Sequence, residues 1–263
     1  MADAQIRFSD GASYDAMMGA WSRSVGEIFL DWLRPPGGAD WIDVGCGSGA
    51  FSSLVIERQA PRSILGIDPS EAQIDFARQR GLGPLVRFER GDAMQLRLAD
   101  RSVDVAVAAL VVHFMPEPAT GVAEMARVTR PGGLVAAYAW DLAGGGFPYQ
   151  AAHEAMRDFG LRAPDPPHPE AANADELLRL WTGTGLAGVA QRQIHVTRRF
   201  IDFDDYWLMA TRSRRIAEVV ERLDAQARSK LMEATRASVP SAPDGSVTPA
   251  ARANAILGRV PAP

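Results

Sequence analysis

The chain has 263 residues, of which 47% are hydrophobic and 23% are charged, so the composition fits a globular protein and excludes a disordered or fibrous one. Its formal net charge of −4 argues against a nucleic-acid partner, because neutralising phosphates requires a basic surface. The single cysteine, Cys46, excludes an internal disulfide bond and fits a reducing compartment.

The sequence predicts no membrane span and no secretory signal. The most apolar run, residues 103–115, is shorter than the ~20 residues that a membrane helix needs, and Asp104 interrupts it. The first ten residues lack both a basic start and an apolar stretch. We therefore expect a cytoplasmic protein.

Strand-like and helix-like segments alternate from residue 21 to residue 140. We expect helices over 21–33, 49–60, 70–81 and 119–130, and strands over 39–45, 63–68, 85–91, 103–109 and 134–140. Ser70 is the expected N-cap of its helix and Gly81 its C-terminal stop, and Pro131-Gly132-Gly133 is expected to end the helix over 119–130. This alternation predicts a doubly wound α/β fold with a parallel sheet, and the apolar strands indicate that both faces of the sheet are covered.

Beyond residue 140 the pattern is less regular. We expect a short helix over 151–159, a proline-rich loop over 162–173, a helix over 174–185, a strand over 189–200, a segment that is helical throughout 203–238, and a last strand over 252–260.

The most informative segment is DVGCGSGAF, residues 43–51, between the first strand and the first helix of the sheet. Its glycines allow a tight turn and close approach of a ligand to the backbone, at the strand ends where α/β sheets bind ligands. The third glycine comes one position earlier than in the G-x-G-x-x-G pattern of nicotinamide-binding loops. The additional carboxylate of Asp43 is unfavourable beside a pyrophosphate but suits a ligand that carries an ammonium group.

Two further acidic residues follow the next strands. Asp68 ends the second strand about 20 residues after the loop, where a carboxylate accepts hydrogen bonds from ribose hydroxyls. Asp92 follows the third strand, where it can accept a hydrogen bond from an adenine amino group. Structural roles remain as alternatives, namely a tight turn for the glycines, a helix cap for Asp68 and a turn residue for Asp92.

In this order the motifs DVGCGSG (43–49), GIDPS (66–70), GDAM (91–94), VDVAVAALVVHFMPEP (103–118) and RPGGLV (130–135) resemble those of class I S-adenosylmethionine-dependent methyltransferases. The resemblance is to the small-molecule branch, methyltransferase type 11, that includes the ubiquinone and menaquinone biosynthesis type. YDAMMGAWSR (14–23) is similar to the helix that covers the cofactor in that branch.

The resemblance implies a Rossmann-like, seven-stranded, mostly parallel sheet whose last strand is antiparallel, with a helical lid between the sixth and seventh strands. We expect a single domain over 1–263, divided into an N-terminal cover (1–38), a cofactor-binding core (39–140), a segment with helices and the sixth strand (141–202), the lid (203–250) and the last strand (251–263).

The predicted cofactor is S-adenosylmethionine, which leaves as S-adenosylhomocysteine. Its expected binding residues are Tyr14, Arg23, Asp43, Gly45, Cys46, Gly47, Asp68, Pro69, Gly91, Asp92, Ala93, Met94, Ala109 and Leu110. The acceptor pocket is expected to include His113, Phe114 and Trp140, with His113 as the candidate general base. The four histidines show no metal-ligand spacing, so we expect no metal.

These features predict methyl transfer to a small-molecule acceptor at oxygen, nitrogen, sulfur or carbon, by in-line displacement, in a monomer or homodimer. Motifs typical of DNA methyltransferases and of magnesium-dependent catechol-type enzymes are not evident in the sequence. Two alternatives remain: a non-catalytic S-adenosylmethionine-binding protein with a regulatory or assembly role, and a nicotinamide-dependent oxidoreductase.

Overall fold

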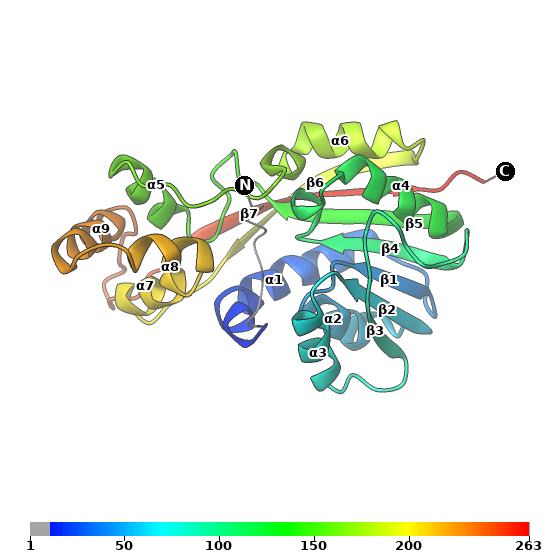
Figure 1. Cartoon of the computed structure of the whole chain (residues 1–263), viewed down its shortest axis with the longest axis horizontal. Helices are drawn as coiled ribbons and strands as arrows, with labels where there is room; N and C mark the ends of the chain where they lie inside the picture. Colours follow the sequence, from blue (N-terminus) through cyan, green and yellow to red (C-terminus); the bar gives the residue numbers. More distant parts are fainter. Residues whose placement is uncertain (1–10, 263) are drawn as a thin grey trace.

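The computed structural model describes residues 11–262, with side chains from residue 18 onward except those of 214 and 215. Seven strands form one sheet in the order β3-β2-β1-β4-β5-β7-β6 (Figure 1). The strands are β1 (Asp40–Val44), β2 (Ser63–Asp68), β3 (Val86–Arg90), β4 (Val103–Ala109), β5 (Thr129–Trp140), β6 (Ala187–Thr197) and β7 (Ala250–Arg259). β7 is antiparallel to both β5 and β6, whereas the remaining pairs are parallel. The predicted Rossmann-like sheet with an antiparallel last strand is confirmed.

Helices cover both faces of this sheet (Figure 1). They are α1 (Gly11–Leu33), α2 (Ala50–Gln59), α3 (Glu71–Gln79), α4 (Pro118–Val128), α5 (Gln150–Asp158), α6 (Ala174–Gly183), α7 (Phe203–Thr211), α8 (Arg214–Val220) and α9 (Ala225–Ala237). Phe29 of α1 and Phe51 of α2 pack in the apolar core on one face, and Met125 of α4 and Trp181 of α6 in that on the other. The central strands are therefore buried on both sides, as their continuous apolar sequences predict.

Local signals in the sequence set most element boundaries. Ser70 caps α3, since its hydroxyl accepts a hydrogen bond from the Gln73 N–H. The prediction that Pro131-Gly132-Gly133 ends α4 is wrong, because α4 ends at Val128 and these residues lie inside β5. The Gly132 N–H donates to the Val260 carbonyl, so pairing with the end of the chain keeps this stretch in the sheet.

The segment over 203–238 forms three helices, so the expectation that it is helical throughout is also wrong. Asp202 caps α7 and Asp224 caps α9 through side-chain oxygens that accept backbone N–H groups, and each cap starts a new helix. Part of the predicted loop over 162–173 is a 3₁₀ turn, Pro169–Ala172.

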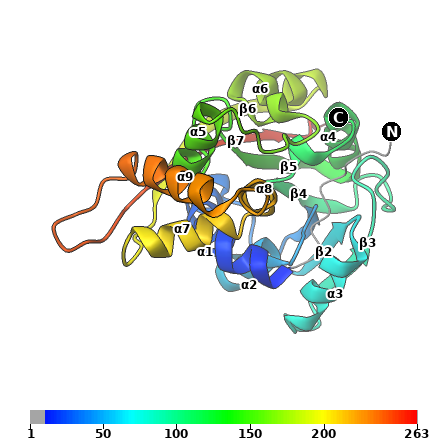
Figure 2. The same cartoon turned by 60° about the vertical axis from the view of Figure 1, so that its left-hand side comes forward.

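α5, α7, α8 and α9 gather at one end of the molecule (Figures 1 and 2). α5 follows the carboxyl end of β5, and α7 that of β6. α7 also contacts α1. These helices therefore lie at the edge of the sheet where parallel strands end, which is the ligand-binding edge of an α/β fold. None of the helices in the described part of the chain is both long and apolar enough to cross a bilayer.

Candidate functional site

The glycine-rich loop joins β1 to α2 and packs against the end of β2. The N–H groups of Gly45 and Cys46 both donate to the Ile67 carbonyl at 2.8 Å. Gly45 and Gly47 have φ angles of +73° and +51°, a left-handed backbone that favours glycine. A Cβ on Gly45 would overlap the Val111 side chain, whereas a Cβ on Gly47 would meet no described atom within 4 Å. Gly45 is thus required for packing, and Gly47 borders open space.

Asp43 is a buried carboxylate beside this loop, with 3% of its surface exposed. The Ser52 hydroxyl donates to its Oδ2 at 2.6 Å, while its Oδ1 has no hydrogen-bond partner among the described residues. Burial raises the pKa of Asp43 to about 6, and the negative charge of Asp68 acts in the same direction. A buried carboxylate with an unused oxygen fits a cationic group of a ligand.

Asp68 connects the glycine loop to α3. Its Oδ2 accepts the Gly47 N–H at 3.1 Å, and its Oδ1 accepts the Ser70 N–H at 2.9 Å. Burial raises the pKa of Asp68, although these two hydrogen bonds oppose the shift. Each carboxylate oxygen has two lone pairs, so both can accept a further hydroxyl. Ser70, rather than Asp68, supplies the side-chain cap of α3.

The segment after β3 forms a turn next to the end of β2. The Gly91 N–H donates to the Asp68 carbonyl at 3.1 Å. Asp92 is exposed, and its Oδ1 accepts the Met94 N–H at 2.9 Å. The Arg90 guanidinium donates to the Pro69 carbonyl. The structure therefore brings together the predicted ribose side (Asp68 and Pro69) and adenine side (residues 91–94) of the site.

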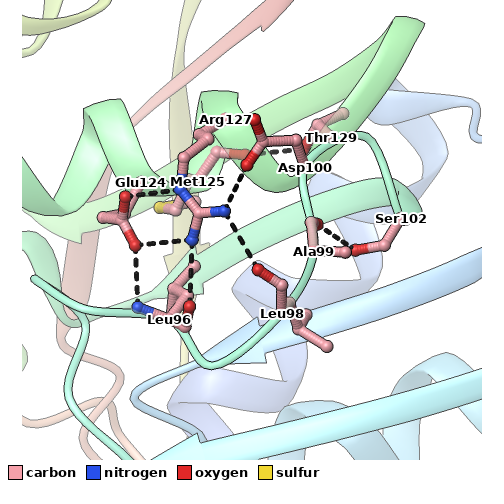
Figure 3. A network of polar contacts seen from close by, with 9 residues as sticks. All are labelled: Leu96, Leu98, Ala99, Asp100, Ser102, Glu124, Met125, Arg127 and Thr129. Carbon is pink, nitrogen blue, oxygen red and sulfur yellow. Dashed lines mark hydrogen bonds and ion pairs between the residues drawn. The ribbon is translucent and has the colours of Figure 1, made fainter.

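A polar network holds the loop that follows this turn (Figure 3). Arg127 of α4 donates to the carbonyls of Leu96 and Leu98 at 2.9 and 3.0 Å, and it pairs with Glu124 and Asp100. Glu124 in turn accepts the Leu96 N–H at 2.8 Å. The sequence shows the Glu124–Arg127 spacing on one helix, but nothing in it indicates that both side chains reach a loop some 30 residues earlier.

β4 ends in an unusual backbone conformation. Leu110 has a φ angle of +63°, which is rare for a residue with a branched side chain, and its N–H donates to the Tyr138 carbonyl at 2.8 Å. His113 follows in a 3₁₀ turn and is 4% exposed, with its ring centroid 4.3 Å from that of Phe114. The His168 N–H donates to the His113 carbonyl. The His113 ring is thus largely closed off from solvent in this structure.

Trp140, the last residue of β5, is 4% exposed. Its indole nitrogen is buried and has no hydrogen-bond partner in the described part of the chain. The next residue, Asp141, binds Arg252 of β7 at 2.6 and 2.8 Å and accepts the Gly144 N–H. Asp141 therefore anchors the loop after β5, whereas no described residue accepts the Trp140 N–H.

Arg23, Tyr14 and Cys46 are three further residues that the sequence predicts to bind the cofactor. The half-exposed Arg23 pairs with Glu27 at 3.2 Å and with Glu57 at 2.6 Å. The side chain of Tyr14 lies outside the described residues. Burial raises the pKa of the Cys46 thiol well above its ordinary value, and the nearby negative charges add to this, so Cys46 packs in the loop as an inert thiol.

Among the side chains that the structure describes, from residue 18 to residue 262 without 214 and 215, no group of three or more histidine, cysteine, aspartate or glutamate residues is arranged to hold a metal ion.

Comparison with known proteins gives a consistent result. A family model described as a methyltransferase domain matches residues 42–137. The malonyl-[acyl-carrier protein] O-methyltransferase of Serratia marcescens is 36% identical over 123 residues, which are 47% of this chain and 46% of that protein. The chain thus spans less than half the length of the curated relatives that it matches first.

Two solved structures share the fold over most of the chain. The YcgJ protein of Bacillus subtilis is 16% identical with a TM-score of 0.60, over 91% of this chain and 99% of that one. Phosphoethanolamine N-methyltransferase 2 of Haemonchus contortus, solved with S-adenosyl-L-methionine, is 14% identical with a TM-score of 0.60, over 99% of this chain and 59% of that one. The family match identifies residues 42–137 as a methyltransferase domain, and the Rossmann-like sheet is the fold of these solved structures.

Proposed function

We propose that this protein transfers the methyl group of S-adenosylmethionine to a small-molecule acceptor at the carboxyl edge of its sheet. The observation that carries the proposal is the buried Oδ1 of Asp43, which no described residue hydrogen-bonds, beside Gly47, whose Cβ would meet none of the described atoms within 4 Å. A nucleotide pyrophosphate would be repelled by that carboxylate, whereas an amino-acid ammonium group would be held by it.

The residues present fit S-adenosylmethionine as the cofactor. Asp43 would accept the ammonium group, the oxygens of Asp68 would accept the ribose hydroxyls, and the turn over 91–94 would border the adenine. Gly47 leaves room for the ligand to approach the backbone, and the Asp68 contact fixes the orientation of the Gly47 N–H. Leu110 and the end of β4 would contact the same molecule from the neighbouring strand.

When bound, this cofactor supplies an electrophilic methyl group on a sulfonium. The chain's contribution is to align the acceptor with that group and to exclude water, since alignment of the reacting atoms provides much of the rate enhancement in such reactions. We propose that α7, α8 and α9 form the lid and α1 the N-terminal cover of a single domain. His113, at the end of β4, is the proposed proton acceptor for substrates that must lose a proton.

The proposal also covers the location, the oligomeric state and the partner of the protein. We infer a cytoplasmic monomer or homodimer whose partner is its methyl acceptor. The acidic net charge supports a small molecule rather than a nucleic acid as that acceptor.

The test is a calorimetric titration with S-adenosylhomocysteine and, in parallel, with NADH. We expect saturable one-site binding of S-adenosylhomocysteine, no binding of NADH, and loss of binding in Asp68→Ala. Asp75→Ala is the matched control, because this carboxylate is exposed and pairs with Arg78 on the same helix, α3. Binding of NADH alone would refute the proposal, and so would equal affinity of Asp68→Ala and the wild type.

A further inference from the structure

Arg80, at the C-terminal end of α3, reaches the glycine-rich loop that follows β1. Its Nε donates to the Ser48 carbonyl, and its Nη2 donates to the Ser48 hydroxyl at 3.3 Å. Both acceptor oxygens belong to one residue of the loop, and this residue is 3% exposed. The planar fork of a guanidinium can donate to two oxygens in a fixed geometry, whereas a lysine ammonium is a point charge on a flexible stem.

Arg80 contacts the loop where the contacts from β2 end. The last two residues of β2 accept the N–H groups of Gly45, Cys46 and Gly47. Ser48 comes next, followed by Gly49, which has a φ angle of +78° and is the N-cap residue of α2. Gly49 has no side chain with which to cap this helix. Arg80 therefore holds the loop at the point where it changes into α2.

α3 also packs directly against this part of the loop. A Cβ on Gly49 would lie 3.2 Å from the Ala77 Cβ of α3 and 2.8 Å from the Phe88 ring of β3. The Arg80 guanidinium lies over the Phe76 ring, 5.7 Å from its centroid, and this cation–π contact favours the observed orientation of the side chain. The loop thus rests on α3, and Arg80 fixes the Ser48 peptide against it.

We propose that Arg80 is a positioning residue for the amino-acid end of the cofactor, because it holds Ser48 and so keeps the glycine-rich loop in its binding conformation. This inference rests on the proposed methyl-transfer function and adds a residue to its site. A glycine-rich segment samples many backbone conformations when nothing holds it. The apparent affinity for a ligand falls with the fraction of molecules whose loop is competent to bind, and Arg80 raises this fraction.

The effect should be confined to one end of the ligand. The loop begins beside Asp43, the proposed partner of the ammonium group, whereas the ribose and the adenine are assigned to Asp68 and to the turn over 91–94. Asp68 keeps its hydrogen bond from the Ser70 N–H, which does not involve the loop. Loss of Arg80 should therefore weaken the binding of the amino-acid end and leave that of the nucleoside end.

The experiment measures the binding of S-adenosylhomocysteine and of 5′-methylthioadenosine, a thioether of the nucleoside that lacks the amino-acid end. Arg80→Met keeps an unbranched apolar side chain and removes the donors. We expect this variant to bind S-adenosylhomocysteine about 3- to 30-fold more weakly, which is part of the contribution of a hydrogen bond to a charged group. It should bind 5′-methylthioadenosine as tightly as the wild type.

Two further variants complete the comparison. Arg80→Lys should lie between Arg80→Met and the wild type, because an ammonium group can still donate to the Ser48 carbonyl. Arg78→Met is the matched control and should bind both ligands like the wild type. Arg78 is on the same helix, but it donates to the Phe88 carbonyl and pairs with Glu71 and Asp75.

Amide hydrogen exchange of the free proteins adds a readout that needs no ligand. Exchange over residues 45–50 should be faster in Arg80→Met than in the wild type, because the loop opens more often. Exchange over β4 should be the same in both proteins. Saturation with S-adenosylhomocysteine should reduce the difference over 45–50, since the bound ligand selects the binding conformation of the loop.

The inference is overturned if Arg80→Met binds S-adenosylhomocysteine like the wild type, loses affinity for both ligands equally, or exchanges at the wild-type rate over 45–50. An equal effect of Arg78→Met would also overturn it. If Arg80→Met does not fold, Arg80→Lys is subjected to the same comparisons and the same criteria. Failure of the wild type to bind S-adenosylhomocysteine would instead refute the proposed function, whereas exchange in the free protein would still test whether Arg80 holds the loop.

Discussion

Replacing Asp43 with asparagine should raise the stability of the free protein, relative to the wild type, as the pH rises, and it should weaken cofactor binding. In the folded protein, burial raises the pKa of this carboxyl from the ordinary value of about 4 to about 6. An acid whose pKa is raised by folding holds its proton more tightly in the folded state. Its contribution to the free energy of unfolding is therefore largest below about pH 4 and decreases as the pH rises to about 6. Above that pH the contribution stays constant at its lowest value.

The difference between the two pKa values corresponds to about 3 kcal/mol, of which about 2 kcal/mol develops between pH 4.5 and 7.5. We expect the free energy of unfolding of Asp43→Asn, relative to the wild type, to rise by about 2 kcal/mol between these pH values. This comparison cancels the pH-independent effects of the asparagine, because they are the same at both pH values. Urea unfolding of both proteins at pH 4.5 and 7.5 measures it directly.

The same variant should bind S-adenosylhomocysteine about 10- to 100-fold more weakly at pH 7.5, since a charge-assisted hydrogen bond to the ammonium group is lost. Wild-type affinity should fall as the pH drops below about 6, and the affinity of the variant should lack this dependence. Asp31→Asn, at an exposed carboxylate that pairs with Arg58, is the control. A stability difference that does not change with pH, or unchanged affinity, would refute this account of Asp43.

Further variants separate packing from ligand binding. Gly45→Ala should lower the free energy of unfolding by about 2 kcal/mol or more, because its Cβ overlaps Val111. Gly47→Ala should lower the free energy of unfolding by about 1 kcal/mol but weaken S-adenosylhomocysteine binding at least 10-fold. Equal binding by the wild type and Gly47→Ala would contradict this. Arg127→Met should weaken that binding roughly 3- to 10-fold and speed hydrogen exchange over 95–102, since the loop loses charge-assisted hydrogen bonds to two carbonyls; unchanged exchange would show that the network does not hold the loop. Asp141→Asn should lower the urea midpoint by an amount equivalent to about 1–2 kcal/mol with binding unchanged, and a loss of binding would place Asp141 in the site.

Much of the fold was predictable because its signals are local. The strand over 63–68 was predicted with the bounds that the structure shows, since an apolar run between a helix end and a capping serine has few other conformations. The strand over Thr129–Trp140 was harder, because Pro131-Gly132-Gly133 is a typical helix stop. Whether this stretch forms a turn or a strand depends on its hydrogen bond with Val260. Val260 follows Gly132 by 128 residues, so the local sequence does not indicate this pairing.

The site shows the same division. The positions of Asp43 and Asp68 followed from motif spacing and strand ends. That no described residue hydrogen-bonds the Asp43 Oδ1 or the Trp140 indole N–H did not follow, because it depends on which side chains fail to reach a buried atom. Long-range partners were equally hidden. The pairing of Asp141 with Arg252 spans 111 residues, and it shows that Asp141 anchors the loop after β5.

A crystal structure of the complex with S-adenosylhomocysteine tests the central claim most directly. The account predicts the ligand's ammonium group within hydrogen-bond distance of the Asp43 Oδ1, its ribose hydroxyls on the Asp68 carboxylate and its adenine beside the turn over 91–94. A ligand bound away from the glycine loop, or bound there with the Asp43 Oδ1 still unpaired, would contradict it.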